Sequence, residues 1–485
     1  MGIFKNVLFI VIVVILSLDF SLATININQD KHVKGLNNRL NYVFKEQILK
    51  NTKLGIEVFS LTKNQSLYSR NTNMVLSPAS TIKVLTAAIA LKKLGPQFKY
   101  KTEVLSDAKI NKGKLSGNLY LKGGGDPTLV TEQMYLLASR IKDRGLKEFT
   151  GDLIVDESVF DSNYVSEHRI NSNSMRPYNA KVNGLSFNYN TTTIVSVPTT
   201  VGVRPELFDV PNTDYIKIVN KAKTVKGGGR SLAVTRSINA SSNILTFNKS
   251  VGVKAARKEH YYNVTEPAIY AGYALIKILQ DTGVILNINQ VKIGKVNSSA
   301  RSIAFIESLP MSEIVRRMNK FSNNFIAESL VKTIGQKVYG GQGTTEKGLR
   351  VLNEEATGMG MNTSGFNVVS GSGLTRKNRV SSNQYMKMLK SVYQNFDIFP
   401  ELMTSLPIAG LDGTLKSRMK DSSAYGKLRG KTGTINGVST MIGFVKSKGG
   451  EILAYSVLMN DNSLSPRFLR EWQNYFGTAL ADFAR

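Results

Sequence analysis

The chain of 485 residues contains no cysteine and only three histidines. Without cysteine it cannot form disulfides, thiolate metal sites or a thiol nucleophile. His32, His168 and His260 are widely separated, and their polar surroundings predict exposed side chains rather than a Ser-His-Asp triad or a metal centre. The sequence therefore predicts no metal and no other cofactor, and any serine chemistry requires a base other than histidine.

Acidic residues are also scarce. The 35 Asp and Glu residues stand against 63 Lys and Arg, which gives a formal net charge of +28. Such a field favours an anionic partner. The chain has no nucleic-acid-binding motif, so we expect cell-wall polymer and, by peripheral contact, an anionic membrane surface rather than nucleic acid. A generally basic surface without a specific partner is the alternative.

The N-terminus carries the pattern of an export signal. After Lys5, an apolar run from Val7 to Leu18 leads to the small residues Ser21 and Ala23. This predicts a signal peptide over residues 1–23, cleaved after Ala23, and a periplasmic mature protein. An uncleaved anchor is the alternative, but the run is shorter than the roughly 20 apolar residues of a spanning helix.

The first sign of catalytic chemistry is the motif Ser80-Thr81-Ile82-Lys83. The S-x-x-K spacing also occurs at Ser60, Ser106 and Ser417, but only Ser80 heads a long apolar helix, predicted over residues 81–94. Positions i and i+3 share a helix face, so the serine and the lysine can meet. Burial favours the neutral amine, which can take the proton of the serine. The alternative reading makes Ser80 a plain helix cap.

Ser322-Asn323-Asn324 falls at a predicted break between two helical segments. In the context of a serine and lysine pair, Ser322 can relay a proton between Lys83 and a leaving amine. Asn324 can hold the peptide of the substrate.

Lys431-Thr432-Gly433-Thr434 is predicted to begin a strand. Gly433 lets a substrate backbone approach closely. Lys431 supplies positive charge that helps to keep Lys83 neutral, and the hydroxyls of Thr432 and Thr434 can bind a substrate carboxylate. The backbone N–H of Thr434 is expected to complete an oxyanion hole with that of the nucleophile.

The two ends of the chain must meet if the first and last motifs share one site. The first two motifs lie 242 residues apart, which is far more than a loop and predicts inserted domains. The elements predicted at the ends are a hairpin over 54–68, strands over 437–445 and 451–459, and a helix over 467–483. Those predicted in the middle are strands over 114–122 and 151–155, helices over 132–144 and 267–282, and a strand-rich stretch over 185–246.

The three motifs, S-x-x-K, S-x-N and K-T-G in this order, are the signature of penicillin-binding proteins and serine β-lactamases. Six further matches extend over most of the chain, and with them the sequence resembles the class C low-molecular-mass penicillin-binding proteins, the D-alanyl-D-alanine carboxypeptidase/endopeptidase family. These matches are Pro78-Ala79-Ser80-Thr81, residues 124–129, 151–156, 371–376, 406–414 and 430–434.

The resemblance implies a multi-domain α/β fold. We expect a transpeptidase-like catalytic domain, an antiparallel sheet flanked by helices, over residues 24–95 and 297–485. An inserted α/β domain is expected over 96–186 and 264–296, and a nested, small β-rich domain over 187–263.

The resemblance also implies the function. We expect a serine peptidase that hydrolyses D-Ala-D-Ala stem peptides or D-Ala cross-links of peptidoglycan through an acyl-enzyme on Ser80, with β-lactams acylating the same serine. The residues leave open whether carboxypeptidase or endopeptidase activity dominates. Arg376 matches an arginine that helps to bind the side chain of the diamino acid in the stem peptide.

Two departures from the family pattern bear on this expectation. Ser370 stands where the family usually has Asp, and Asn323 stands where Asp is common; an acidic partner in the insert is also unclear, with Asn188 near its place. A peptidoglycan-binding scaffold with weak catalysis is therefore the alternative, and Ser370 is the feature in its favour. The intact three motifs argue against this scaffold. A β-lactamase is disfavoured by the long insert, and an anionic-surface adhesin that uses the charge of +28 would tolerate loss of Ser80.

Overall fold

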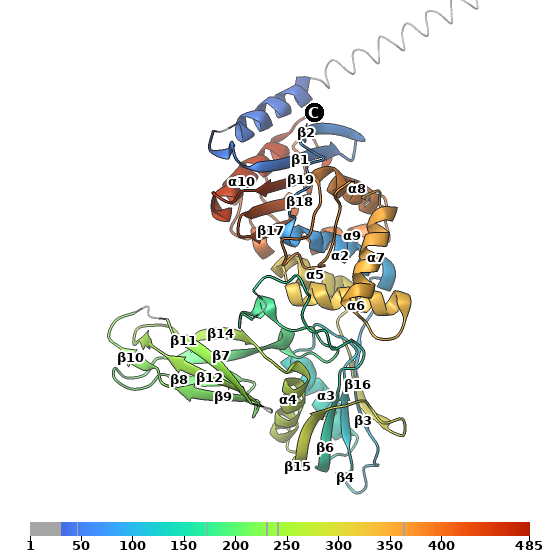
Figure 1. The fold of residues 1–485 in the computed structure, drawn as a ribbon, viewed down its shortest axis with the longest axis vertical. Helices are drawn as coiled ribbons and strands as arrows, with labels where there is room; N and C mark the ends of the chain where they lie inside the picture. The colour runs from blue at the N-terminus through green and yellow to red at the C-terminus, as the bar shows by residue number, and fades with distance from the viewer. Residues whose placement is uncertain (1–30, 46, 172, 229–230, 240–241, 362–363) are drawn as a thin grey trace, which may run out of the picture. The chain divides into compact units, whose positions relative to one another are not determined.

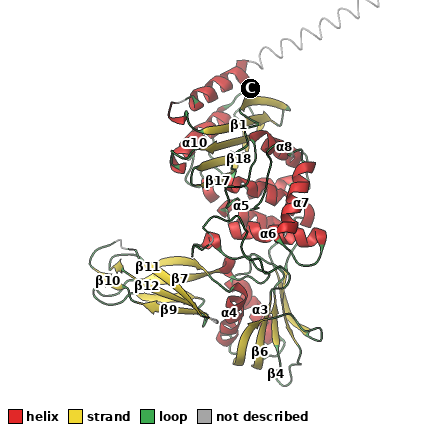
Figure 2. Ribbon diagram, in the orientation of Figure 1, coloured by secondary structure: helices red, strands yellow, loops and turns green. Residues whose placement is uncertain are grey.

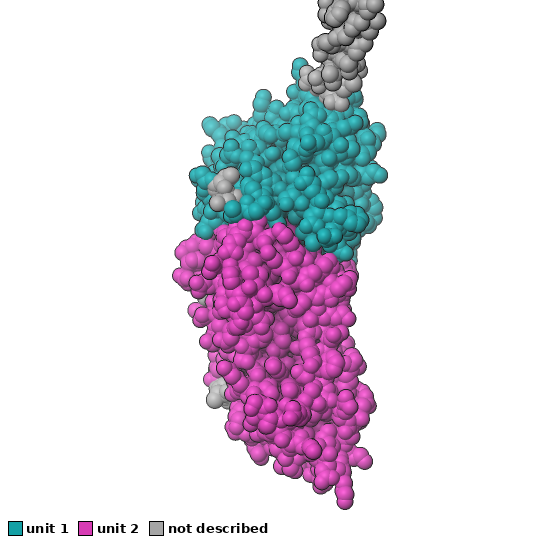
Figure 3. Space-filling model, turned by 90° about the vertical axis from the view of Figure 1, so that its right-hand side faces the viewer, with its two compact units in different colours: residues 1–81, 356–367, 378–485 teal, residues 82–355, 368–377 magenta. Residues whose placement is uncertain are grey.

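The structure is a computed structural model that describes residues 31–45, 47–171, 173–228, 231–239, 242–361 and 364–485. The predicted signal peptide and its cleavage after Ala23 lie outside these residues. Among the helices described, none has the length and hydropathy to span a membrane. The chain divides into two compact units, which Figure 3 colours separately: unit 1 comprises residues 1–81, 356–367 and 378–485, and unit 2 comprises residues 82–355 and 368–377.

Unit 1 is built on a five-stranded sheet in the order β17-β18-β19-β1-β2, in which every neighbouring pair is antiparallel. The N-terminal hairpin thereby joins the C-terminal strands, as predicted, with Leu54 opposite Met459. The strands are β1 (Lys53–Ser60), β2 (Gln65–Arg70), β17 (Leu428–Ile435), β18 (Val438–Lys446) and β19 (Ile452–Asn460).

Helices cover this sheet. α10 (Pro466–Asp482) packs against β17, β18 and β19, and α8 (Ser382–Tyr393) packs against β1 and β19 (Figure 1). The middle strands are buried at nearly every position, which requires cover on both faces. The predicted antiparallel sheet flanked by helices is confirmed. Residues 31–44 are also helical, and Phe44 packs on Phe476 of α10 at a centroid distance of 6.0 Å.

Unit 2 contains a mixed sheet in the order β15-β6-β5-β3-β16, with β4 beside β6. β4, β5 and β15 run parallel to β6, whereas β3 is antiparallel to β5 and β16. The strands are β3 (Lys101–Ser106), β4 (Lys114–Ser116), β5 (Leu119–Lys122), β6 (Glu148–Asp156), β15 (Ile285–Ile293) and β16 (Arg301–Glu307).

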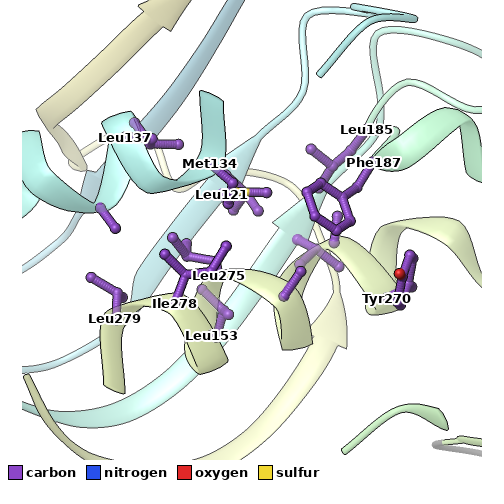
Figure 4. Close-up of a cluster of buried hydrophobic side chains, with 14 of the residues drawn as sticks. Leu121, Met134, Leu137, Leu153, Leu185, Phe187, Tyr270, Leu275, Ile278 and Leu279 are labelled. Carbon is purple, nitrogen blue, oxygen red and sulfur yellow. The ribbon is translucent and has the colours of Figure 1, made fainter. Parts of the chain in front are cut away.

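Two helices bury the apolar face of this sheet. They are α3 (Thr131–Asp143) and α4 (Pro267–Asp281), both close to the predicted bounds. Figure 4 shows leucines of the strands meeting side chains of both helices, with Leu121, Met134, Leu137, Leu153, Leu275 and Ile278 among them.

The single strand predicted over residues 114–122 is wrong, because the chain breaks between β4 and β5 at Gly117. There the Gly117 N–H donates to the carbonyl of Thr150 at 3.1 Å. The backbones approach so closely that a Cβ on Gly151 would lie 1.9 Å from the Gly117 carbonyl oxygen. This contact turns the chain out of the first strand before the second begins.

The predicted β-rich region is present, and Figure 2 draws it almost wholly as strands and loops. It begins at Thr191 rather than at Leu185, because Asn188, Tyr189 and Asn190 form a tight turn with positive φ. Its strands are β7 (Thr191–Val197), β8 (Glu206–Val210), β9 (Ile216–Asn220), β10 (Lys223–Val225), β11 (Ala233–Asn239), β12 (Ser242–Asn248), β13 (Ser250–Gly252) and β14 (Lys258–Asn263).

The histidines differ from expectation. His32 is exposed, but His168 and His260 are partly buried. The Nε2 atom of His260 lies 3.0 Å from the hydroxyl of Ser196. The pairing of β14 with β7 brings these two side chains together, which residue type alone does not reveal.

Unit 2 also contains a layer of helices that carries Lys83 of the first motif and the residues of the second motif. Its helices are α2 (Lys83–Leu94), α5 (Met311–Phe321), α6 (Asn324–Tyr339) and α7 (Thr345–Gly358), and α2 packs against α5 and α6. The predicted catalytic domain, 24–95 and 297–485, thus contributes to both units. The three-domain division stays a prediction.

The remaining elements are short. α9 (Phe399–Ser405) is a helix of unit 1, and the 3-10 turns are Gln47–Leu49, Ala79–Ile82, Pro177–Asn179, Asn188–Asn190 and Gly413–Leu415.

Glycines allow α6 and α7 to cross closely. A Cβ on Gly348 of α7 would lie 1.9 Å from the carbonyl oxygen of Val331 in α6, and a Cβ on Gly335 would lie 2.5 Å from the Gly348 nitrogen. No side chain fits between the two backbones. The crossing fixes α6, whose first residue is Asn324 of the second motif.

We predict that Gly348→Ala lowers the free energy of unfolding by about 2 kcal/mol, because the added methyl group forces the two helices apart. Gly358→Ala is the matched control: it lies in the same helix with no atom within 4 Å of its Cβ position. Its effect should stay below about 1 kcal/mol. Urea unfolding followed by circular dichroism measures both, and equal stability of the two variants would contradict the packing argument.

Candidate active site

Lys83 is the first residue of α2 and is fully buried. The apolar helix that follows remains buried through Leu91, so the lysine cannot reach solvent along its own helix. Its Nζ donates to the Oδ1 of Asn324 at 2.8 Å and to the carbonyl oxygen of Ser372 at 2.5 Å. Unit 2 thus brings together Lys83 and Asn324, two of the predicted site residues.

Burial lowers the pKa of Lys83 to about 7, and the charge of Glu328 acts in the opposite direction. A neutral amine has two N–H donors and one lone pair. The oxygens of Asn324 and Ser372 can accept from these donors, and the lone pair of a neutral amine can accept a proton. The lowered pKa of Lys83 agrees in direction with the neutral lysine that the sequence predicts.

The second motif forms the break between α5 and α6, as predicted. Ser322 ends α5 in a left-handed conformation with φ of 55°. Asn323 caps α6 by accepting a hydrogen bond from the Ile326 N–H at 3.0 Å. Asn324 then begins α6, and its amide nitrogen donates to the carbonyl of Tyr178 at 3.4 Å. Both ends of the Asn324 amide are engaged, which fixes its orientation toward Lys83.

The second acceptor of Lys83 comes from the loop of residues 370–376. Thr86 of α2 holds this loop by donating to the Gly371 carbonyl at 2.9 Å. A Cβ at Gly371 would lie 2.3 Å from a methyl of Val331, so only glycine fits between the loop and α6. Arg376, at the end of the loop, is exposed.

Sequence reasoning missed Glu328. This residue of α6 is buried, and its Oε1 accepts from the Ser370 hydroxyl at 2.7 Å and from the Ser372 N–H at 3.1 Å. The available signal was its spacing, since Glu328 lies four residues after Asn324 and so on the same helix face. The role of the Ser372 carbonyl had no side-chain signal.

In unit 1, the segment that carries Ser80 packs against β17. The Pro78 carbonyl accepts from the hydroxyls of Thr81 and Thr440, each at 2.7 Å. A Cβ on Gly433 would lie 2.6 Å from the Pro78 oxygen and 3.0 Å from the Ser80 nitrogen. Unit 1 therefore brings together Ser80 and Gly433, and the glycine is required by this close approach.

The other residues of the third motif lie in the middle of β17 rather than at its start, because the strand already begins at Leu428. Lys431 is fully buried, and its Nζ donates to the carbonyl of Thr432 at 2.7 Å. The Thr432 hydroxyl lies 2.7 Å from that of Thr414, and Thr434 is exposed.

The first motif joins the two units through the chain itself. Ser80 belongs to the 3-10 turn Ala79–Ile82 in unit 1, and α2 follows directly at Lys83 in unit 2. The backbone is helical from one residue to the other, which corresponds to about one turn.

The serines of the other S-x-x-K matches, and Asn188, lie in other parts of the fold. Ser60 ends β1 and donates to Glu451, Ser106 ends β3, and Ser417 lies in a turn. Asn188 accepts from the Thr131 N–H at 3.1 Å at the start of α3.

The chain is similar to known proteins in both sequence and fold. Residues 36–476 match the model of the D-Ala-D-Ala carboxypeptidase 3 (S13) family. The chain is 32% identical to a D-alanyl-D-alanine carboxypeptidase of Actinomadura sp. (strain R39) over 87% of this chain and 80% of that protein. It is 27% identical to a D-alanyl-D-alanine carboxypeptidase of Haemophilus influenzae over 93% and 91%. The crystal structure of penicillin binding protein 4 from H. influenzae has the same fold, with a TM-score of 0.77 at 23% identity over 92% and 99% of the chains.

We predict that Gly433→Ala slows acylation of the protein by benzylpenicillin about 100-fold, because the methyl group displaces the backbone at Ser80. The rate is read from the intact mass of the protein as the adduct forms. Thermal unfolding of the variant gives the control: a variant that melts near the wild-type temperature but acylates at the wild-type rate would contradict the prediction.

Proposed function

The chain belongs to the D-Ala-D-Ala carboxypeptidase 3 (S13) family and is a serine-type D-alanyl-D-alanine peptidase, and on this premise we propose that Ser80 is its nucleophile and Lys83 the base that activates it. The observation that carries the proposal is the buried Lys83 amine, whose two donors match two fixed acceptors. A neutral amine held in this way has a lone pair that can accept a proton, and the hydroxyl of Ser80 is one helical turn away along the chain.

In acylation, the Ser80 hydroxyl transfers its proton to Nζ of Lys83 as its oxygen attacks the carbonyl of the penultimate D-Ala. The resulting oxyanion accepts hydrogen bonds from the backbone N–H groups of Ser80 and Thr434. The C–N bond then breaks, and the leaving amine takes a proton from Lys83 through the Ser322 hydroxyl. The products are an ester on Ser80 and a free amine.

In deacylation, water attacks this ester and gives its proton to Lys83. The Ser80 oxygen leaves and regains a proton, which restores the free enzyme. Neutral Lys83 is therefore needed in both half-reactions, as the proton acceptor from serine in the first and from water in the second.

The remaining predicted residues bind the substrate in this proposal. Asn324 holds the peptide, and the hydroxyls of Thr432 and Thr434 bind the terminal carboxylate in the positive field of Lys431. Arg376 is exposed, as a residue that contacts the side chain of the stem-peptide diamino acid must be.

We propose peptidoglycan as the substrate, with both terminal D-Ala and D-Ala cross-links cleaved. The two reactions form the same acyl-enzyme and differ only in the amine that leaves. β-Lactams would acylate Ser80 by the same attack on their ring carbonyl. A non-catalytic scaffold is not favoured, since binding a peptide does not require a buried lysine of lowered pKa.

We also propose that residues 1–23 export the protein to the periplasm. There its formal charge of +28 would favour anionic wall polymer and peripheral contact with the membrane surface.

The test of the proposed function uses defined pentapeptide and cross-linked muropeptides, with products identified by mass spectrometry. We expect the wild type to release D-Ala and to convert dimers to monomers, and Ser80→Ala to do neither. Release of D-Ala alone would restrict the activity to a carboxypeptidase. An unchanged Ser80→Ala variant, or a wild type without products, would contradict the proposal.

The pH dependence of kcat/KM tests whether Lys83 is the base. Because the pKa of Lys83 is lowered to about 7, kcat/KM should fall about tenfold per pH unit below that value, as protonation removes the base. Lys83→Arg, which stays protonated, should lose activity at every pH. Release of D-Ala followed from pH 5 to 9 measures this, and a rate that does not change between pH 5 and 7 would rule out Lys83 as the base.

A further inference from the structure

One face of α6 carries two polar side chains. Asn324 and Glu328 are one turn apart on this helix, and Asn324 accepts directly from Lys83. Glu328 is 4% exposed, and a carboxylate is seldom buried to this degree unless it is paired with other groups. Its surroundings connect it to the same lysine by a second route.

That route runs through the loop of residues 370–373. Glu328 Oε1 accepts from the N–H of Ser372, and the carbonyl of Ser372 accepts from Lys83. Glu328 also accepts from the Ser370 hydroxyl, which in turn accepts from the Gly373 N–H at 3.1 Å. The carboxylate thus holds the turn of the loop that presents the Ser372 carbonyl.

We propose that Glu328 is a positioning residue for Lys83: its carboxylate fixes the loop that supplies one acceptor of the amine and places a buried negative charge beside that amine. The inference rests on the proposed role of Lys83 as the base. Through α6, both acceptors of the lysine are then set by one helix, Asn324 directly and Ser372 by way of Glu328.

The hydrogen bonds that Glu328 accepts do not by themselves require a negatively charged side chain. A neutral glutamine could accept from Ser370 and Ser372 through its amide oxygen. Within the described structure, Oε2 of Glu328 is buried without a hydrogen-bond donor, an arrangement that costs free energy for a carboxylate. The negative charge is therefore explained by the cations that it faces rather than by the loop alone.

The cations that interact with this charge include the buried Lys83 and Lys332 and the partly buried Arg169. Lys332 has its own acidic partner, Asp161, at 2.5 Å. Arg169 donates to the Ala180 carbonyl at 2.8 Å. Lys83 donates to the neutral oxygens of Asn324 and Ser372, and the charge of Glu328 raises its pKa against the effect of burial.

Ser370 fits this arrangement. Its hydroxyl donates to Glu328 at 2.7 Å, whereas an acidic residue in its place would oppose two carboxylates, of which one would have to be protonated. The departure from the family pattern at Ser370 thus leaves an acidic group beside the loop, supplied by α6.

The test is the pH profile of acylation by benzylpenicillin in Glu328→Gln. The glutamine retains an acceptor but removes the charge, so the ammonium form of Lys83 is less stabilised. The acidic limb of the profile should move to lower pH by about one unit. A limb that stays in place, with only a lower plateau, would overturn the inference and leave Glu328 with a structural role.

Two variants separate charge from packing. Glu328→Asp keeps the charge on a shorter side chain, so its limb should stay near that of the wild type while its rate falls. If Glu328→Gln does not fold, Glu328→Asp becomes the test. An acidic limb displaced by a full pH unit in Glu328→Asp would then contradict the inference. Glu355→Gln is the matched control, because Glu355 pairs with Lys92 and Lys93 at the far end of α2 and should leave the profile unchanged.

The acylation experiment distinguishes an error in the proposed function from an error in the role of Glu328. If wild-type protein formed no adduct on Ser80 at any pH, the nucleophile and base would be wrong. If it formed the adduct with an acidic limb that the glutamine variant does not move, only the role of Glu328 would be wrong.

Discussion

The burial of the Lys83 amine is the constraint on which the rest of the structure depends. A lysine at the head of an apolar helix cannot keep its charge without compensation, and desolvation lowers its pKa to about 7. The amine is retained there because Asn324 and the Ser372 carbonyl satisfy its donors. Those two acceptors come from segments more than 200 residues away in sequence, so the surroundings of Lys83 are complete only when distant parts of the chain have come together.

Close backbone contacts hold the supporting elements in place. Gly348 lets α7 cross α6, Gly371 lets the loop lie against α6, and Gly433 lets β17 lie against the segment of Ser80. Each of these positions would bring a Cβ within 3 Å of another atom. Since a packed interior transmits small displacements, a methyl group at these glycines acts on the site without changing a reactive side chain.

Much of this site could be predicted from the sequence where the signal is local. The helical spacing of Ser80 and Lys83 separated this pair from the other S-x-x-K matches, and the alternating strands at both ends predicted the sheet of unit 1. The break that places Asn324 at the head of α6 was also predicted. All of these depend on periodicity, turns and caps within a few residues.

What could not be predicted depends on contacts between distant segments. The carbonyl of Ser372 has no side-chain signature, and Glu328 appeared as an ordinary helical acid until the loop of residues 370–373 was placed against it. The break at Gly117 arises from the backbone of Gly151 on another strand. The partial burial of His260 likewise follows from the pairing of β14 with β7.

The protonation of Lys83 can be measured directly. Protein labelled with 13C at the lysine Cε positions can be titrated by NMR, with the Lys83 signal assigned from its absence in Lys83→Arg. The account predicts one lysine that titrates near pH 7, well apart from the others, and that this signal is the one missing from the variant. Titration of Lys83 together with the bulk of the lysines, near their ordinary pKa of about 10.4, would contradict the account.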